Sequence, residues 1–340
     1  MTEKQYGGAA QFGLKENIIK SNDKSNSELP ISKRLSDKED ESNLSISEEE
    51  IKKLKAAGTM AKETILYAKS IIKKGMPLLE IAEKIESKIV ELGGKPAFPI
   101  NLSINEIAAH STPSWNDSQT ASGLLKVDIG VHIDGYIADT AFSIDLENSE
   151  ENKKLIEAAE FALHEAVKKI SLSTPIKEIG STIEKSIKSF NFQPISNLSG
   201  HSIELFNLHA GTTIPNYDNY QLRLLEKGIY AIEPFSTNGL GSVKDSKLSG
   251  IYHLEKPGNV RDPFAREVLV FIKEEFKTLP FCSRWIYKKF GSRGLLALKR
   301  IEESGSLHHY PQLIETGKGK VAQAEHTIIL TEKEKIITTL

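Results

Sequence analysis

The stretch VDIGVHIDGYIADT, residues 127–140, predicts two antiparallel β-strands joined by a two-residue turn at Asp134-Gly135. Such a turn fixes which residues face each other, so the alternation of side chains can be followed along both strands. Asp128 and Asp139 then become diagonal neighbours on one face, with small residues opposite them. The other face carries larger apolar side chains: Val127, Ile129, Val131, Tyr136, Ala138 and Phe142.

These two aspartates leave two interpretations open. Acidic side chains on the open face of an antiparallel sheet commonly lie in water. Diagonal carboxylates from adjacent strands can instead converge on metal ions about 3.5–4 Å apart. The hairpin alone favours the solvated face, and a metal site requires further ligands from elsewhere in the chain.

Three later segments supply candidate ligands. His201 and His209 lie in one of them, Glu233 ends an apolar run that Pro234 stops, and Glu325 opens a β-rich run near the C-terminus. Each signal alone is weak, because a single histidine in an apolar strand is more often a hydrogen-bonded core residue. A glutamate within a strand is less common and needs a partner if it is buried.

A helical pattern that starts at Pro77 recurs 98 residues later, at Pro175. A helix is expected before each copy, over about 51–73 and 151–170, and a histidine-bearing, strand-like segment after it. Six identities at one offset predict an internal pseudo-two-fold, with two α+β halves facing each other across a cleft. The identities are Pro77/Pro175, Glu80/Glu178, Ile81/Ile179, Ile85/Ile183, Glu86/Glu184 and Ile89/Ile187.

Residues 1–46 differ in composition from the rest of the chain. They are rich in Ser, Asn, Asp, Glu and Lys, which predicts a disordered tail. Ser47 and Glu50 have the spacing of a helix capping box, so a folded domain is expected over 47–340. The single cysteine, Cys282, excludes an intramolecular disulfide and a cysteine-based zinc site. With a net charge of −2 and no apolar run long enough to span a bilayer, we expect a cytoplasmic protein without a membrane partner.

In their order and local surroundings, the candidate ligands resemble those of the methionine aminopeptidases. The resemblance spans roughly residues 47–340 and includes the segment AAHSTP, whose His110 resembles a substrate-facing histidine of that family. It implies the α+β pita-bread (creatinase/aminopeptidase) fold, shared with aminopeptidase P, prolidase and creatinase. The positions that match the family's five metal ligands are Asp128, Asp139, His201, Glu233 and Glu325.

The interval between Glu233 and Glu325 is 92 residues, far longer than in bacterial type I enzymes. It resembles the helical insertion of type II enzymes, which implies an insertion subdomain at 246–309 within the catalytic domain. The sequence has neither the zinc-binding region of eukaryotic type I forms nor the polybasic tail of eukaryotic type II forms. An archaeal-type enzyme with an additional tail is therefore the closest description.

The resemblance implies two divalent metal ions, which we expect to be Co, Mn, Fe or Zn because oxygen-rich ligation with one imidazole suits these about equally. Asp139 and Glu325 would bridge both ions, Asp128 would hold one, and His201 with Glu233 would complete the other. Two divalent cations would also balance four carboxylates that otherwise raise one another's pKa values.

The same resemblance implies the reaction. The metal pair would lower the pKa of a bridging water, and the resulting hydroxide would attack the carbonyl carbon of an N-terminal methionine. Glu233 would also shuttle the proton, and His110 and His209 would contact the scissile peptide. A free N-terminal amine bound on the Asp128 side would limit cleavage to one residue.

Three residues are candidates for the methionine pocket. Phe98 lies 12 residues before His110, and Tyr310 lies 15 before Glu325; both positions resemble pocket residues of the family, and Leu208 is a candidate for the wall. The chain departs from the eukaryotic family at Asn101, where those enzymes have glycine. The position of His253 relative to this pocket is left open.

The expected function is removal of the initiator methionine from nascent proteins whose second residue is small. Nascent polypeptide N-termini are the expected partner, and the enzyme is expected to act as a monomer. Two alternatives remain: another pita-bread peptidase of the aminopeptidase P or prolidase kind, and a non-catalytic ribosome- or RNA-binding homologue of the fold. The complete ligand set argues against loss of catalysis.

A cluster of basic residues in the insertion leaves a further question open. The helical pattern predicts that the aromatic residues between them pack inward and that the charges point outward, either as a solvated face or as a contact with the ribosome surface. The basic residues are Lys277, Arg284, Lys288, Lys289, Arg293, Lys299 and Arg300.

Overall fold

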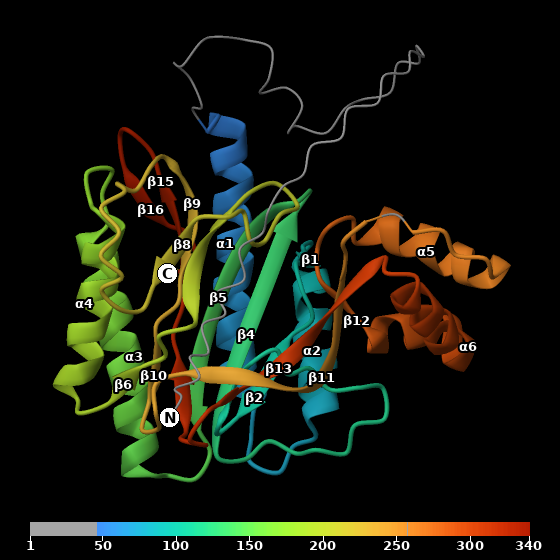
Figure 1. Ribbon diagram of the computed structural model, residues 1–340, viewed down its shortest axis with the longest axis horizontal. Helices are drawn as coiled ribbons and strands as arrows, with labels where there is room; N and C mark the ends of the chain where they lie inside the picture. Colours follow the sequence, from blue (N-terminus) through green and yellow to red (C-terminus); the bar gives the residue numbers. More distant parts are fainter. Residues whose placement is uncertain (1–45, 257) are drawn as a thin grey trace, which may run out of the picture. The chain divides into compact units, whose positions relative to one another are not determined.

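The predicted hairpin forms two long central strands in the computed structural model, which describes residues 46–256 and 258–340 (Figure 1). Its register is the predicted one, with Asp128 opposite Ala141 and Asp139 opposite Gly130. Both turn residues, Asp134-Gly135, have positive φ angles, which two-residue hairpin turns require. The two strands are β4 (Leu124–Ile133) and β5 (Tyr136–Asp145). Strands β1 (Lys95–Pro96) and β2 (Asn101–Ile104) pair with β4 on its other edge.

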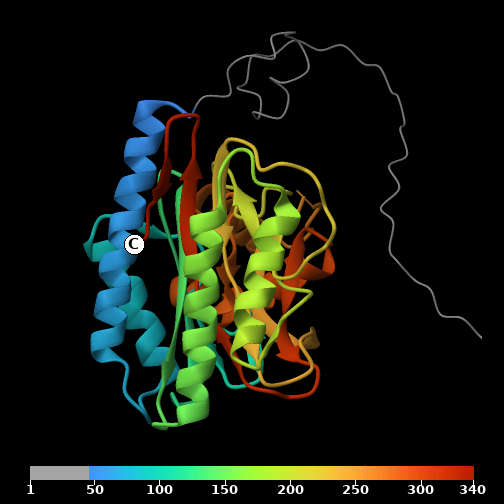
Figure 2. The same ribbon diagram turned by 90° about the vertical axis from the view of Figure 1, so that its left-hand side faces the viewer.

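The apolar face of this sheet packs against helices α1 (Glu48–Ile71) and α2 (Leu78–Glu91), and α1 runs along the outside of the hairpin in Figure 2. The predicted capping box begins α1: Ser47 Oγ accepts a hydrogen bond from the Glu50 amide, and the Ser47 amide donates to the Glu50 carboxylate at 2.8 Å. Five of the six residues predicted for the apolar face lie in this core, namely Val127, Ile129, Val131, Ala138 and Phe142; the sixth, Tyr136, is half-buried beside the turn.

The second half repeats this arrangement with helices α3 (Glu150–Lys169) and α4 (Ile176–Ser189). Pro175 precedes α4 as Pro77 precedes α2, so the sequence repeat corresponds to equivalent helix starts. These helices pack on a sheet ordered β16-β15-β9-β7-β8. Its strands are β7 (Ser199–Ile203), β8 (Thr213–Pro215), β9 (Gly228–Ile232), β15 (His326–Leu330) and β16 (Lys335–Ile337). The α+β class is confirmed.

Two smaller sheets connect the halves to the insertion. One has the order β14-β10-β6, and the other β12-β11-β13-β3. The first contains β6 (Gln193–Pro194), β10 (Phe235–Thr237) and β14 (Val321–Gln323). The second contains β3 (Ile107–Ala109), β11 (Val243–Leu254), β12 (Phe281–Cys282) and β13 (Leu307–Glu315).

Helices α5 (Pro263–Glu275) and α6 (Ser283–Glu303) lie between β11 and β13 and have an apolar core of their own. They project to one side of the molecule in Figure 1. The predicted insertion, 246–309, begins inside β11 and ends inside β13, so its ends are continuous with a sheet that also contains β3. The predicted tail, 1–46, lies outside the described residues except for its last member.

One expectation for the insertion is wrong. Arg284 does not point outward: its side chain is 3% exposed and forms an ion pair with Glu86 of α2. The spacing of charges along α6 could not reveal this, because the partner lies on a helix nearly two hundred residues earlier. Among the described residues, no helix is both long and apolar enough to cross a membrane.

Candidate metal centre

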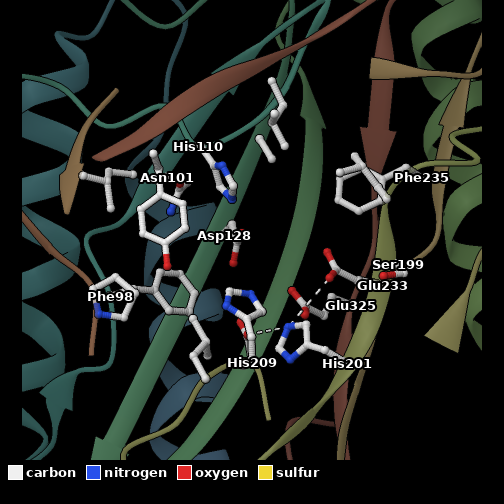
Figure 3. A pocket seen from close by; sticks show the side chains of 18 of the residues that line it. Phe98, Asn101, His110, Asp128, Ser199, His201, His209, Glu233, Phe235 and Glu325 are labelled. Atoms are coloured by element: carbon white, nitrogen blue, oxygen red, sulfur yellow. Dashed lines mark ion pairs between the residues drawn. The ribbon is translucent and has the colours of Figure 1, made fainter. Parts of the chain in front are cut away.

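The acidic face of the hairpin lines a cavity of about 350 Å³ between the two halves (Figure 3). All five predicted ligands line it, and in Figure 3 Asp128 lies on one side with His201 and Glu233 across from it. Asp139 is 3% exposed, and Oδ1 of Asp128 is buried. The solvated-face interpretation of the hairpin is therefore wrong.

The two halves meet along strands β5 and β15. This contact positions the carboxylates of Asp139, in β5, and Glu325, just before β15. The Glu325 amide donates to the Ala141 carbonyl at 3.0 Å, and Thr140 Oγ1 donates to the Glu325 carbonyl at 2.8 Å. Glu325 itself lies in the short gap between β14 and β15, where the chain passes from one sheet to another. Its side chain points toward His201 in Figure 3.

Glu233 occupies a similar gap between β9 and β10, ahead of Pro234. Its backbone carbonyl accepts from Asn216 Nδ2 at 3.3 Å, and its carboxylate accepts from Gln323 Nε2 at 3.4 Å. Gln323 was not predicted as a site residue, and its position at the end of β14 gives it a role. It orients Glu233 from the strand that leads to Glu325.

The polar atoms of four of the five side chains lie close together. Nε2 of His201 is 3.7 Å from Oδ2 of Asp139 and 3.7 Å from Oε1 of Glu233. Asp139, His201 and Glu325 each offer one ligand atom, and these three atoms all lie within 4.8 Å of one another. A group of this size and composition is suited to divalent metal ions.

Burial and mutual repulsion leave the carboxylates poorly stabilised as anions. Burial raises the pKa of Asp128 to about 7. The pKa values of Asp139, Glu233 and Glu325 are raised well above their usual range, first by burial and then by the neighbouring carboxylates. Oδ1 of Asp128 and Oδ1 of Asp139 are buried without a hydrogen-bond donor among the described residues. Buried, unpaired carboxylate oxygens are what a bound cation would satisfy.

Two further histidines reach the same cavity. The His209 ring lies edge-on to the His201 ring with centroids 4.4 Å apart, and burial lowers the pKa of His209 to about 3. His110 lines the cavity from the segment after β3, with Nδ1 3.3 Å from the Pro311 carbonyl, and burial lowers its pKa. Both rings are therefore neutral at pH 7. His209 has one N–H to donate, whereas the Nδ1–H of His110 donates to the Pro311 carbonyl and leaves its Nε2 as an acceptor.

The predicted pocket residues Phe98, Leu208 and Tyr310 all line this cavity. Gly130 makes room for Phe98, because a Cβ at position 130 would lie 2.3 Å from the Phe98 ring. Asn101 also lines the cavity and pairs directly with Asp128 across β2 and β4. Its Nδ2 donates to the Pro99 carbonyl, and its Oδ1 is buried without a donor among the described residues.

His253 does not line the cavity, although its ring lies 5.3 Å from the Tyr310 ring, centroid to centroid. It therefore stands behind the cavity wall rather than in it. Phe235 and Leu313 line the cavity without having been singled out in the sequence, because nothing distinguishes them there from other core positions.

Comparisons with known proteins give a family match over most of the chain. A family model described as metallopeptidase family M24 matches residues 52–332. The chain is 48% identical over 297 residues to a methionine aminopeptidase of Pyrococcus abyssi, covering 85% of this chain and 99% of the relative. It is 44% identical over 290 residues to one of Methanocaldococcus jannaschii, covering 84% and 97%.

Solved structures show the same fold at lower identity. A methionine aminopeptidase from Thermotoga maritima matches with a TM-score of 0.63 and 21% identity, covering 86% of this chain and 97% of that one. A thermophilic Arx1 matches with a TM-score of 0.75 and 16% identity, covering 86% and 91%. The expected pita-bread fold is thereby confirmed.

Proposed function

Because this chain belongs to metallopeptidase family M24 and is a metalloaminopeptidase that removes N-terminal methionine, we propose that its five clustered side chains hold two divalent metal ions. Asp139 and Glu325 would bridge the ions, Asp128 would complete one, and His201 with Glu233 the other. The supporting observation is the pair of buried carboxylate oxygens, on Asp128 and Asp139, that have no donor among the described residues.

The bound ions would supply an activated water at neutral pH and an electrophile for the scissile carbonyl. The residues around them have separate tasks. Glu233, at the edge of the group and held by Gln323, is suited to carry a proton from that water to the departing amine. His110 and His209, both neutral, are proposed to contact the scissile peptide: His209 can donate a hydrogen bond, whereas His110, whose Nδ1–H faces the Pro311 carbonyl, presents Nε2 as an acceptor.

The remaining wall is apolar and fits a methionine side chain. Phe98, Leu208 and Tyr310, which line the cavity, are proposed to contact it. We propose nascent chains with a small second residue as substrates, Co, Mn, Fe or Zn as the ions, and a monomer in the cytoplasm as the acting form.

One experiment separates this proposal from its alternatives. Metal content is measured after reconstitution with each ion, and turnover is measured on Met-Ala-Ser and on an Xaa-Pro dipeptide. We expect two ions per chain at full activity and cleavage of Met-Ala-Ser. Preference for the Xaa-Pro dipeptide would indicate a prolidase-like enzyme, and absence of turnover in a metal-loaded protein would indicate a binding homologue. Full activity with one ion per chain would overturn the two-metal proposal.

A further inference from the structure

A buried ion pair connects the helical insertion to the segment that carries His110. Arg284, near the start of α6, donates to both carboxylate oxygens of Glu86 in α2, at 2.6 and 2.8 Å. Trp285 Nε1 donates to the same carboxylate at 2.9 Å. The side chains of Arg284 and Glu86 are 3% and 12% exposed, respectively, so water does not replace these contacts.

The guanidinium also contacts the chain just after His110. Its Nε donates to the Pro113 carbonyl at 3.1 Å, and one terminal nitrogen lies 3.4 Å from Thr112 Oγ1. Thr112 Oγ1 in turn donates to the Ile100 carbonyl at 2.9 Å. Four N–H···O contacts of one arginine are therefore shared between α2 and residues 112–113.

The segment held in this way contains a strained residue. His110 has a φ angle of +57°, in the left-handed region that non-glycine residues rarely adopt. Such a conformation persists when surrounding contacts determine it. The next residue, Ser111, accepts from the Leu102 amide at 2.6 Å through its carbonyl and from Gln312 through its hydroxyl.

We propose that Arg284 is a positioning residue for His110, through which the helical insertion takes part in catalysis. The Glu86 carboxylate fixes the guanidinium, the guanidinium fixes residues 112–113, and these hold the strained backbone that aims the His110 ring into the cavity. The proposal rests on the proposed role of His110 at the scissile peptide. Displacement of a catalytic group by about 1 Å can lower turnover by about a hundredfold.

A double-mutant cycle tests the coupling. Arg284→Met leaves Glu86 buried without its partner, so Arg284→Met/Glu86→Gln is made as well; it removes both charges and keeps an amide oxygen for Trp285. In both variants we expect kcat/KM on Met-Ala-Ser to fall about 10- to 100-fold, mostly in kcat, with metal content unchanged. In a His110→Ala background the same changes should lower kcat/KM by less than twofold.

The matched control is Lys95→Met, because Lys95 joins β1 to the insertion through an exposed ion pair with Glu275 at 2.9 Å. It should leave activity unchanged. Hydrogen exchange of the metal-free protein gives a second readout: exchange over residues 99–113, including the Leu102 amide, should accelerate in the Arg284 variants and not in Lys95→Met.

The outcomes separate this inference from the proposed function. If His110→Ala itself retains full activity, the proposed role of His110 is wrong. If His110→Ala is impaired but Arg284→Met/Glu86→Gln lowers activity by the same factor in both backgrounds, Arg284 has a general structural role and the inference fails. Unchanged exchange over 99–113 would also overturn it.

Discussion

Asp139 and Thr327 exchange two hydrogen bonds across the junction of the two halves. The Asp139 amide donates to Thr327 Oγ1 at 2.7 Å, and the same hydroxyl donates to the Asp139 carbonyl at 2.8 Å. Thr327 lies two residues after Glu325 and is fully buried. One hydroxyl thus fixes the spacing between the strands that carry both proposed bridging carboxylates.

Thr327→Val should weaken metal binding although the two side chains have nearly the same volume. Valine fills the same space but leaves the Asp139 amide buried without an acceptor, which costs about 1–3 kcal/mol of folding free energy. Metal affinity, measured by calorimetry, should fall about 10- to 100-fold, as expected when groups that orient metal ligands are lost. The control is Thr59→Val, because Thr59 is exposed on α1 and its hydroxyl donates to the Lys55 carbonyl of the same helix. A lowered melting temperature with unchanged metal affinity would contradict this view of Thr327.

Glu233→Ala and Asp139→Asn should impair different properties of the enzyme, turnover in the first and metal binding in the second. Glu233 is proposed as both ligand and proton carrier, so alanine should lower kcat by orders of magnitude while the protein stays folded and holds at least one ion. Asp139 is a proposed bridge, so asparagine should abolish binding of the metal pair. Metal content and peptide turnover, assayed at buffered free-metal concentration, distinguish the two. Near-normal activity in either variant would refute its assignment.

The metal-free protein should lose stability as the pH rises through the raised pKa values of its buried carboxylates. Asp139, Glu233 and Glu325 have pKa values raised by burial and repulsion, and a raised folded-state pKa gives stability that is lost as the pH passes through it. Lys126 opposes this, because burial lowers its pKa to about 7, but it is one group against three. Unfolded histidines, with pKa values of about 6.5, keep a small protonated fraction at pH 7 that is lost by about pH 8; because this contribution also occurs with metal bound, comparing the metal-free with the metal-loaded protein isolates the carboxylates.

Thermal unfolding from pH 7 to 8.5, with chelator and with metal, measures this effect. We expect the melting temperature of the metal-free protein to fall and that of the loaded protein to change little, because bound cations keep the carboxylates ionised. Metal binding at pH 7 should also release protons, seen as an enthalpy that depends on the buffer. A metal-free melting temperature that rises with pH would show that the carboxylates are not protonated in the folded protein.

Cleavage should depend strongly on the second residue of the peptide. His110 and His209, which line the cavity, are proposed to flank the scissile bond, where their rings would crowd the side chain of the second residue. The kcat/KM for Met-Ala-Ser should exceed that for Met-Lys-Ser by about a hundredfold. This ratio corresponds to a difference of about 2.7 kcal/mol in transition-state free energy, which a steric clash can supply. Comparable values for the two peptides would argue against a maturation enzyme with this specificity.

The hairpin and its aspartates were predictable because their geometry is local. A two-residue turn at Asp134-Gly135 fixes the register, and the register places Asp128 and Asp139. The remaining proposed ligands came from resemblance, since no local rule brings His201 or Glu325 across to this hairpin. The structure supplies that step through the contact between β5 and β15.

The contacts that escaped prediction depend on distant partners. Arg284 lies in a helical pattern typical of an exposed basic face, and its burial follows from Glu86 on another helix. Gln323 has an orienting role because β14 pairs with β10, which places Gln323 opposite Phe235, two residues after Glu233; the sequence of β14 does not show this pairing. Asn101, recognised as a departure from the eukaryotic pattern, faces Asp128 through the pairing of β2 with β4.

The basic face of α6 is the last feature that an experiment should decide. Arg284 is buried and so does not belong to this face. The exposed basic residues are Lys288, Lys289, Lys299 and Arg300. Arg300 pairs with Asp262, and Lys299 lies 4.0 Å from Glu303. If this face binds ribosomal RNA, changing these four residues to Glu should reduce ribosome co-sedimentation and flatten its dependence on salt, because fewer counterions are released. Cleavage of free peptides should be unchanged. A variant with Lys52, Lys55, Lys153 and Lys154 changed to Glu carries the same charge difference on α1 and α3 and should sediment like the wild type. If both variants lose co-sedimentation equally, the effect comes from net charge and not from the α6 face. If both co-sediment like the wild type, the α6 face is solvated surface only.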